Sequence, residues 1–243
     1  MTMNAEFNEF GYPVWGLLPR KTKFGTLKGV PIFRDVIELI PEKDMPDLLK
    51  QHEGLDQFVP AEGVYDQNSV GSCASEAANQ GNSIVRVMAG QPWVLFNPWF
   101  TYHRVSGGID AGSALDDNVA DLMKYGSCPE AVWSRTNGWR KEPSDEAYQH
   151  ALKYRLLEAF DLQSVGDMRT ALLKGFTVYY GSKGHAKLFT RMLDVNTGRY
   201  VNSWGDWGDH GFGTEAFRGI AIQYGAFAMR CSLDTGENLP GGK

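Results

Sequence analysis

The sequence has few cysteines, and they lie far apart. Its 243 residues contain only Cys73, Cys128 and Cys231, with no CxxC pair among them. Structural zinc sites take Cys and His ligands in closely spaced pairs, so we expect no metal, and no motif indicates a cofactor. A disulfide between two of the cysteines would leave the third unpaired, so three reduced thiols is the simpler interpretation.

Long apolar runs are missing as well. No stretch approaches the roughly 18 apolar residues that a membrane span needs. The N-terminus lacks the basic and apolar segments of a secretory signal, and no N-x-S/T glycosylation acceptor occurs. We therefore expect a cytoplasmic chain without membrane contact, which is also compatible with incorporation into, or delivery by, a larger particle.

The sequence also has no overall excess of basic charge. With 24 Lys and Arg against 29 Asp and Glu, its formal net charge is −5, which argues against nucleic-acid binding. The exception is the segment 10–34, which has no acidic residue and carries Arg20, Lys21, Lys23 and Lys28. This basic arm is interpreted either as a solvated surface segment or as a docking site for an acidic protein partner.

The composition changes along the chain and divides it into an extension and a domain. Residues 1–58 form an N-terminal extension interrupted by Pro and Gly, and residues 59–243 form the domain. We expect helices over 72–88, 113–126 (with Ser113 as N-cap), 143–160 and 166–175, and strands over 176–181, 185–193, 199–204 and 220–230. This segregation predicts an α+β fold, in which a helical lobe over about 59–160 packs on an antiparallel β lobe over about 161–235. A site made from both lobes would lie in the cleft between them.

Cys73 is the cysteine placed for chemistry, because it stands at the predicted start of the helix over 72–88. A nucleophilic cysteine must be a thiolate, and the free N–H groups and partial positive charge of a helix N-terminus stabilise one. Alanine and glycine on one face of this helix indicate that it is buried and pressed against another backbone. Position alone leaves open the alternative of a small buried structural thiol.

A thiolate nucleophile also needs a histidine as its ion-pair partner and proton donor. His103 and His150 lie in predicted helices, His52 lies in the extension, and His210 lies in a Gly-rich turn. His185 opens a predicted strand of the second lobe. It is the histidine best placed to face the nucleophile across the cleft.

Two amide side chains complete the candidate set. Asn202 follows His185 by 17 residues, a spacing that suits two neighbouring antiparallel strands, and it would hold the imidazole tautomer. Gln67 precedes Cys73 by six residues, close enough to point its amide at an oxyanion beside the Cys73 backbone N–H. Each amide, taken singly, is more typical of a surface or turn residue.

Taken in order, the segments "DQNSVGSCASEA", "GHAKLF" and "YVNSWGDWGDHGFG" resemble the papain-like cysteine proteases. The segment "DAGSALDDNVADLMKYGSCPEAVWS" resembles prokaryotic members of that family, so the resemblance covers roughly residues 60–230. It implies a papain-like two-lobe fold and a peptidase in which Cys73 is the nucleophile, His185 is the general base and acid, and Asn202 orients the imidazole. It also implies that Gln67 and the Cys73 N–H form the oxyanion hole.

The same resemblance assigns further residues to the cleft. Trp204 would shield the histidine–asparagine hydrogen bond from water, and Trp207 matches the second tryptophan of the same motif. Gly71 and Ser72 before the nucleophile, and Gly184 before the histidine, are expected to line the binding cleft.

The sequence departs from the family pattern at several positions. The cysteine that the family carries three residues before the nucleophile, disulfide-bonded to the same lobe, is Val70 here. The aromatic residue that follows the nucleophile is Ala74, which is expected to leave an open wall on the primed side of the cleft. Lys187 and Arg191 share the strand face of His185, so that face is either solvated or meets an acidic partner.

The extension over 1–58 is also unusual for the family. It is short for an inhibitory propeptide and lacks the long charged helix pattern of one. The sequence therefore favours a permanently ordered arm or a partner-binding arm over self-inhibition.

Two functions of different classes remain. The first is a cysteine endopeptidase that acts on a peptide or protein substrate, forms a thioester on Cys73 and hydrolyses it with water. The second is a papain-fold component of a larger assembly, such as a phage particle or a delivered effector, with weak, altered or no proteolysis. Deamidation, transglutamination or hydrolysis of another amide would pass through the same thioester, so the sequence does not separate them from proteolysis.

Overall fold

The chain forms one antiparallel sheet with helices against both of its faces. The computed structural model describes residues 16–220 and 222–232. The strands are β1 (Leu156–Asp161), β2 (Thr177–Ser182), β3 (His185–Met192), β4 (Thr197–Val201), β5 (Phe212–Ala216) and β6 (Ala226–Ser232). The helices are α1 (Phe33–Val36), α2 (Met45–Leu49), α3 (Cys73–Met88), α4 (Pro98–Ser106), α5 (Leu115–Lys124), α6 (Asp145–Ala151), α7 (Val165–Leu173) and α8 (Trp207–His210). The strand order is β1-β6-β2-β3-β4-β5 with antiparallel neighbours throughout, so the predicted α+β class is confirmed.

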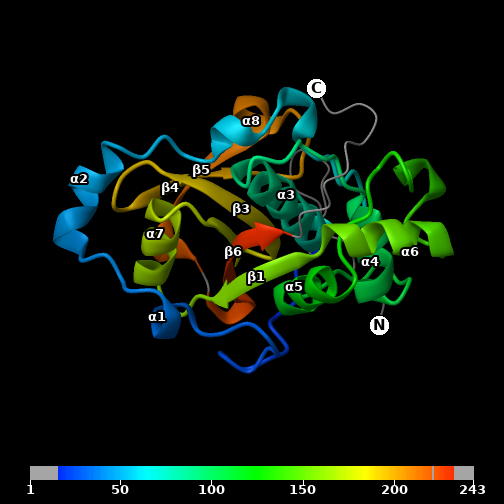
Figure 1. Cartoon of the computed structure of the whole chain (residues 1–243), viewed down its shortest axis with the longest axis horizontal. Coiled ribbons are helices and arrows are strands. Elements are labelled where there is room, and N and C mark those ends of the chain that lie inside the picture. The colour runs from blue at the N-terminus through cyan, green and yellow to red at the C-terminus, as the bar shows by residue number, and fades with distance from the viewer. Residues whose placement is uncertain (1–15, 221, 233–243) are drawn as a thin grey trace.

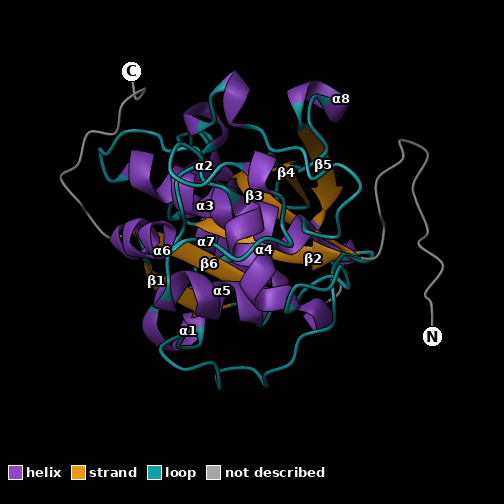
Figure 2. Cartoon of the chain, turned by 90° about the vertical axis from the view of Figure 1, so that its right-hand side faces the viewer, coloured by secondary structure: helices purple, strands orange, loops and turns teal. Residues whose placement is uncertain are grey.

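The helices form two groups that the sheet and α3 separate. Figure 1 shows α4, α5 and α6 together on one side of the molecule and α7, α1 and α2 on the other. In the view turned by 90°, α4 and α5 lie in front of the strands (Figure 2). The helical lobe therefore comprises α3 to α6, and the β lobe comprises the sheet with α7.

The pleat of β2 explains how one sheet serves two cores. Tyr179 belongs to the core that the sheet shares with α3 and α5, whereas Val178 and Tyr180 belong to the core on the opposite face. Successive side chains of a strand point to opposite faces, so a strand that is buried throughout packs both cores at once. Phe33 and Met45, from the predicted extension, are buried in the second core. Residues 33–49 thus pack as part of the β lobe.

Helix α3 is the central element of the fold and carries the candidate nucleophile at its first position. It begins at Cys73, as predicted, and packs against β2, β3 and β6 and against α4 and α5. A Cβ added at Gly81 would collide with the Met229 side chain of β6 and lie 3.3 Å from Leu188 of β3. The small residues that the sequence places on this helix therefore allow its backbone to approach the sheet closely.

Three sequence predictions about individual elements are wrong. The predicted helix over 143–160 ends as α6 at Ala151, and its second half is β1, because pairing with β6 overrides the helical propensity of its Leu, Ala and Glu residues. Ser113 is not the N-cap of α5, which begins at Leu115 after Ala114; the backbone of Ser113 pairs with the N-terminal arm instead. The predicted strand over 220–230 begins only at 226, and β5 was not predicted because its segment is rich in glycine.

The basic arm is bound to the body of its own chain. Arg20 makes two hydrogen bonds of 2.7 and 2.6 Å with the completely buried carboxylate of Asp161 at the end of β1. Lys21 pairs with Asp117, and the backbone N–H groups of Lys21 and Thr22 donate to Asp116. The acidic groups that this part of the arm meets are thus carboxylates of α5 and β1.

The structure gives no indication of a membrane span: across the residues that it describes, no helix is both long and apolar enough to cross a bilayer.

Candidate active site

Cys73 lies at the N-terminal end of α3 and is completely buried. The backbone of Ala186, the residue after His185, lies near its thiol and opposes the rise of the thiol pKa. The thiol therefore faces the start of β3, across the boundary between the helical lobe and the β lobe.

His185 and Asn202 are brought together by the pairing of β3 and β4. His185 opens β3, Asn202 follows the end of β4, and the two strands are in antiparallel register. His185 Nε2 and Asn202 Oδ1 are 2.6 Å apart. Since Nε2 is engaged by the amide, the other ring nitrogen, Nδ1, is left buried and without a hydrogen-bond partner in the part of the chain that the structure describes.

The two tryptophans of the predicted motif cover this hydrogen-bonded pair. The indole ring of Trp204 stacks on the imidazole of His185, with ring centroids 4.6 Å apart and planes inclined by 27°. Trp207 packs edge-on against Trp204, with centroids 5.2 Å apart. The stacked indole excludes water from one face of the imidazole and restricts its rotation.

Gln67 is buried beside the segment that carries the asparagine. Its Oε1 accepts a hydrogen bond of 2.7 Å from the Ser203 hydroxyl, and its backbone N–H donates to the Ser203 carbonyl at 2.9 Å. Its Nε2 donates to the Val70 carbonyl at 2.9 Å. An amide nitrogen carries two N–H groups, so this contact uses one donor and leaves the second.

The loop before Cys73 is fixed by packing and hydrogen bonds at Val70, where the papain-like proteases that the sequence resembles carry a disulfide-bonded cysteine. Val70 is buried in a cluster with Tyr102 and Trp139. The Gly71 N–H donates to Asp110 Oδ1 at 2.9 Å, and the Tyr102 hydroxyl donates to the same oxygen at 2.7 Å. Cys73 and Cys128 are both free thiols, and the side chain of Cys231 lies outside the described residues.

Ala74 does not form an open wall beside the nucleophile, so this prediction is wrong. Its side chain is completely buried, and its carbonyl accepts a hydrogen bond of 2.9 Å from the Tyr179 hydroxyl of β2. The small side chain allows the first turn of α3 to rest directly on the sheet.

The cleft over Cys73 is occupied by the chain's own residues 16–18. The Ser113 N–H donates to the Gly16 carbonyl at 3.0 Å, and the Leu18 N–H donates back to the Ser113 carbonyl at 3.1 Å. On the other side, the Leu17 N–H donates to the Gly184 carbonyl at 3.1 Å. This segment, which we call the cleft strap, therefore pairs with the helical lobe through Ser113 and with the β lobe through Gly184.

The strap lies in direct contact with Cys73. A Cβ added at Gly16 would lie 2.9 Å from the Cys73 sulfur and 2.8 Å from the Gly71 carbonyl oxygen. The Leu17 side chain is almost completely buried and lies beside Gly181 of β2. This contact was not predicted from the sequence, where a lone glycine between apolar residues is its only signal.

Burial under the strap favours the uncharged forms of both reactive groups. Loss of hydration raises the pKa of the Cys73 thiol to about 12 and lowers the pKa of the His185 imidazole to about 4. With the strap in place, neutral pH therefore leaves a thiol and a neutral imidazole rather than a thiolate–imidazolium pair.

The cations on the His185 face of β3 meet carboxylates of the same chain. Lys187 Nζ lies 2.9 Å from Glu215 of β5, which also accepts from the hydroxyls of Ser182 and Tyr180. Arg191 lies 4.0 Å from Asp56. Of the two interpretations of this face, the structure thus supports an acidic partner that lies within the chain itself.

The other histidines have separate surroundings. His103 of α4 hydrogen-bonds Glu142 and the Trp139 carbonyl, and His210 contacts the exposed Asp206. Within 16–220 and 222–232, no group of three or more His, Cys, Asp and Glu side chains could hold a metal ion.

Two charged residues beside the start of α3 were not predicted from the sequence: the buried Glu76 and the partly buried Arg135. Their side chains lie 2.6 Å apart, and the Glu76 side chain is completely buried. The sequence does place Glu76 one helical turn after Cys73, in a helix whose small and apolar residues predict burial, and a carboxylate is unusual there. Nothing in the sequence links it to Arg135, which is 59 residues away.

The chain is similar in fold to solved papain-like cysteine proteases. Xylellain, a cysteine protease from Xylella fastidiosa, matches 89% of this chain over 95% of its own, with a TM-score of 0.66 and 22% identity. Procathepsin B S9 from Trypanosoma congolense matches 88% of this chain over 86% of its own, with a TM-score of 0.59 and 13% identity. The proform of the ragweed pollen cysteine protease Amb a 11 matches 82% of this chain over 68% of its own, with a TM-score of 0.59 and 15% identity. No family model and no curated protein sequence matches the chain.

Proposed function

We propose that this chain is a cysteine peptidase that cleaves peptide bonds through a thioester on Cys73. The observation that carries the proposal is the 2.6 Å contact between His185 Nε2 and Asn202 Oδ1 under the Trp204 indole. It fixes the imidazole, whose other nitrogen has no hydrogen-bond partner among the described residues, while the backbone of the adjacent Ala186 lies near the Cys73 thiol. The fold similarity to cysteine proteases supports the same reaction class.

In this mechanism the Cys73 thiolate attacks the peptide carbonyl carbon while His185 holds the proton taken from the thiol. The carbonyl oxygen becomes an oxyanion, which accepts hydrogen bonds from the Cys73 N–H and from the second N–H of the Gln67 amide. His185 then gives its proton to the leaving amine, and the C–N bond breaks to leave a thioester. A water molecule that loses a proton to His185 hydrolyses the thioester and restores the thiol.

The strap makes the covered chain a latent form of this enzyme. A substrate backbone and residues 16–18 would compete for the same Ser113 and Gly184 groups, so a peptide enters only when the strap leaves. Departure of the strap rehydrates Cys73 and His185, which removes the cause of their shifted pKa values and allows the ion pair to form.

The alternative of a non-enzymatic assembly component has less support. This alternative rests on the basic arm, on the charged residues of the strand that begins at His185 and on the absence of a propeptide pattern. Arg20 and Lys187 are paired with Asp161 and Glu215 of the same chain, so these charges do not call for an external partner.

The direct test incubates the full chain and its Cys73→Ala variant with a mixture of peptides and identifies the products by mass spectrometry. We expect new peptide N-termini from the parent chain and none from the variant. Equal cleavage by the variant would contradict the nucleophile assignment. Products that are deamidated or cross-linked but not cleaved would assign another acyl transfer to the same thiol.

A further inference from the structure

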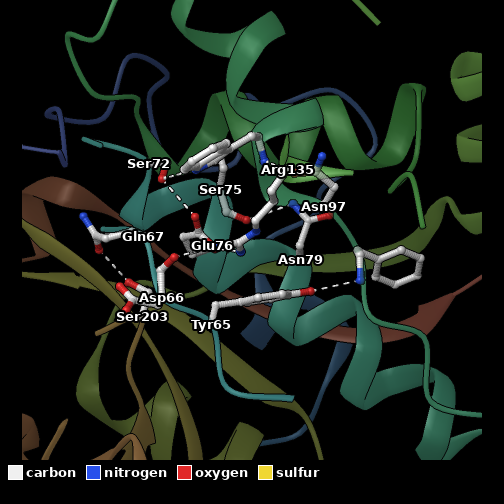
Figure 3. A network of polar contacts seen from close by, with 12 residues as sticks. Tyr65, Asp66, Gln67, Ser72, Ser75, Glu76, Asn79, Asn97, Arg135 and Ser203 are labelled. Atoms are coloured by element: carbon white, nitrogen blue, oxygen red, sulfur yellow. Dashed lines mark hydrogen bonds and ion pairs between the residues drawn. The ribbon is translucent and has the colours of Figure 1, made fainter. Parts of the chain in front are cut away.

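Arg135 connects two segments that carry the proposed oxyanion donors. Its Nη1 donates to the Asp66 carbonyl at 2.6 Å, directly before Gln67, and its Nη2 lies 2.6 Å from Glu76 Oε2 on the first turn of α3. Figure 3 shows Arg135, Glu76, Asp66 and Gln67 within one network of polar contacts. One guanidinium thus spans the segment that presents the Gln67 amide and the helix end that presents the Cys73 N–H.

The Arg135 side chain is itself held in place. Its backbone N–H donates to Glu130 Oε1 at 2.7 Å, and Ser134 donates to the same oxygen at 2.8 Å. The guanidinium carbon lies 5.0 Å from the centroid of the Tyr65 ring and 5.6 Å from that of the Trp99 ring. These contacts restrict the planar fork to the orientation in which its two ends reach two different acceptors.

Glu76 transmits this connection to the residue before the nucleophile. Its Oε1 accepts a hydrogen bond of 2.9 Å from the Ser72 hydroxyl, and Ser72 in turn accepts one of 3.2 Å from the Trp99 indole N–H. Burial raises the pKa of Glu76, and the guanidinium of Arg135 opposes that rise. The carboxylate is therefore paired on both oxygens, which a completely buried carboxylate requires.

The segment on the other side is equally constrained. The backbone of Gln67 pairs with Ser203, and the Gly205 N–H donates to the Tyr65 carbonyl at 3.0 Å. Residues 65–67 therefore lie between Arg135 on one side and the segment that follows Asn202 on the other. A displacement of the Asp66 peptide would therefore carry the Gln67 amide with it.

We propose, on the basis of the proposed function, that Arg135 and Glu76 are positioning residues that set the geometry of the oxyanion hole. Neither touches the substrate. Arg135 fixes the spacing between the Gln67 amide and the Cys73 N–H, and Glu76 fixes the peptide before Cys73 through Ser72. The hydrogen bond to the Asp66 carbonyl extends this ion pair to the segment that carries Gln67.

The test compares two reactions of the same thiol in the full chain. The tripeptide aldehyde acetyl-leucyl-leucyl-norleucinal adds Cys73 Sγ to its carbonyl carbon, and its oxygen enters the oxyanion hole and takes up the thiol proton. Iodoacetamide forms an S–C bond and releases iodide, so it creates no oxyanion. Both reactions need an open strap and a thiolate, so the ratio of aldehyde affinity to alkylation rate isolates the oxyanion hole.

We expect Arg135→Met to lower this ratio roughly tenfold, below the 10²–10³ found when an oxyanion donor is deleted, because the donor is displaced rather than removed. In peptide hydrolysis, kcat should fall with little change in KM. In a Gln67→Ala background, Arg135→Met should change the ratio less than twofold, because the amide that Arg135 positions is no longer present. Arg135→Lys keeps the charge but cannot span both acceptors, so it should resemble Arg135→Met and serves if the methionine variant fails to fold.

The matched control is Arg104→Met, which breaks another ion pair of the helical lobe, the Arg104–Asp121 pair between α4 and α5. It should lower thermal stability and leave the ratio unchanged. The pH profile of alkylation is recorded for each variant, because Tyr102, Tyr179 and Glu76 interact electrostatically with the thiol. A profile that moves without a change in the ratio would overturn positioning in favour of a purely electrostatic role.

An unchanged ratio in Arg135→Met, or an equal effect with and without Gln67, would overturn the inference while leaving the proposed function intact. A parent chain that neither binds the aldehyde nor cleaves peptides, yet alkylates at Cys73, would instead contradict the proposed function, and the inference would fall with it.

Discussion

Replacement of Gly16 by alanine should drive the strap out of the cleft. The added Cβ would lie 2.8 Å from the Gly71 carbonyl oxygen and 2.9 Å from the Cys73 sulfur, both closer than carbon atoms approach such groups. Neither neighbour can yield easily, because Gly71 is fixed to Asp110 and Cys73 begins the buried helix α3. The clash is therefore relieved by movement of residues 16–18.

The size of the effect follows from two opposing contributions. Overpacking of a tight site costs about 1–3 kcal/mol, which acts on the covered form alone. Alanine also has less backbone freedom than glycine in the released strap, which favours the covered form by about 0.4–1 kcal/mol. The difference is therefore about 0–2.6 kcal/mol, and its middle value of about 1.3 kcal/mol corresponds to a roughly ninefold increase in the open population.

The assay is the second-order rate of Cys73 alkylation by iodoacetamide at neutral pH, with the peptide cleavage rate measured in parallel. Gly166→Ala is the matched control, because a Cβ there would meet its nearest neighbour, the Ser164 hydroxyl, at an ordinary 3.5 Å. We expect both rates to rise by the same factor in Gly16→Ala and to stay at the parent level in the control. Equal rates in all three proteins would refute the idea that the strap bars the cleft.

Three further predictions concern the strap and the candidate dyad. Arg20→Ala removes the ion-pair partner of the buried Asp161 carboxylate, a change that typically costs about 3–5 kcal/mol. We therefore expect a lower thermal unfolding temperature together with faster alkylation of Cys73. A destabilised chain with unchanged alkylation would mean that this ion pair does not hold the strap. The covered form should lose stability relative to the open form as the pH falls from about 6.5 to about 4, because the pKa of His185 is lowered in the covered form and protonation favours the hydrated, open form. The hydrogen-exchange protection of the Leu17 amide should drop over that range. Protection that is constant with pH would contradict this linkage. Asn202→Ala removes the hydrogen bond to the His185 imidazole, which becomes charged during the reaction; such a bond contributes about 1.5–3 kcal/mol. We therefore expect kcat/KM to fall by roughly 10- to 150-fold. A loss below twofold would show that Trp204 alone orients the ring.

The sequence predicts those parts of the site that depend on local structure or on pairing of neighbouring strands. The start of α3 at Cys73 follows from small residues and apolar spacing, and the approach of His185 to Asn202 follows from a spacing that suits two paired strands. The same reasoning fails for β1, where residues of high helical propensity are made into a strand by pairing with a segment about 70 residues further along the chain.

The cleft strap and the Arg135–Glu76 pair were beyond prediction for a related reason. Each depends on contacts between segments far apart in sequence, and neither leaves a periodic pattern. A single glycine at position 16 and a single glutamate in a buried helix are compatible with many structures, and only the packed arrangement distinguishes among them.

The loop before Cys73 is held in place without a disulfide, so oxidation or reduction of the Cys73 thiol leaves the contacts that support this loop unchanged. Val70 packs with Tyr102 and Trp139, and Gly71 is bound to Asp110. A disulfide-braced loop is weakened by the same thiol reagents that keep a catalytic cysteine reduced. Here a reductant acts on the nucleophile and leaves this brace untouched, so the activity should rise with reductant concentration to a plateau without a later decline.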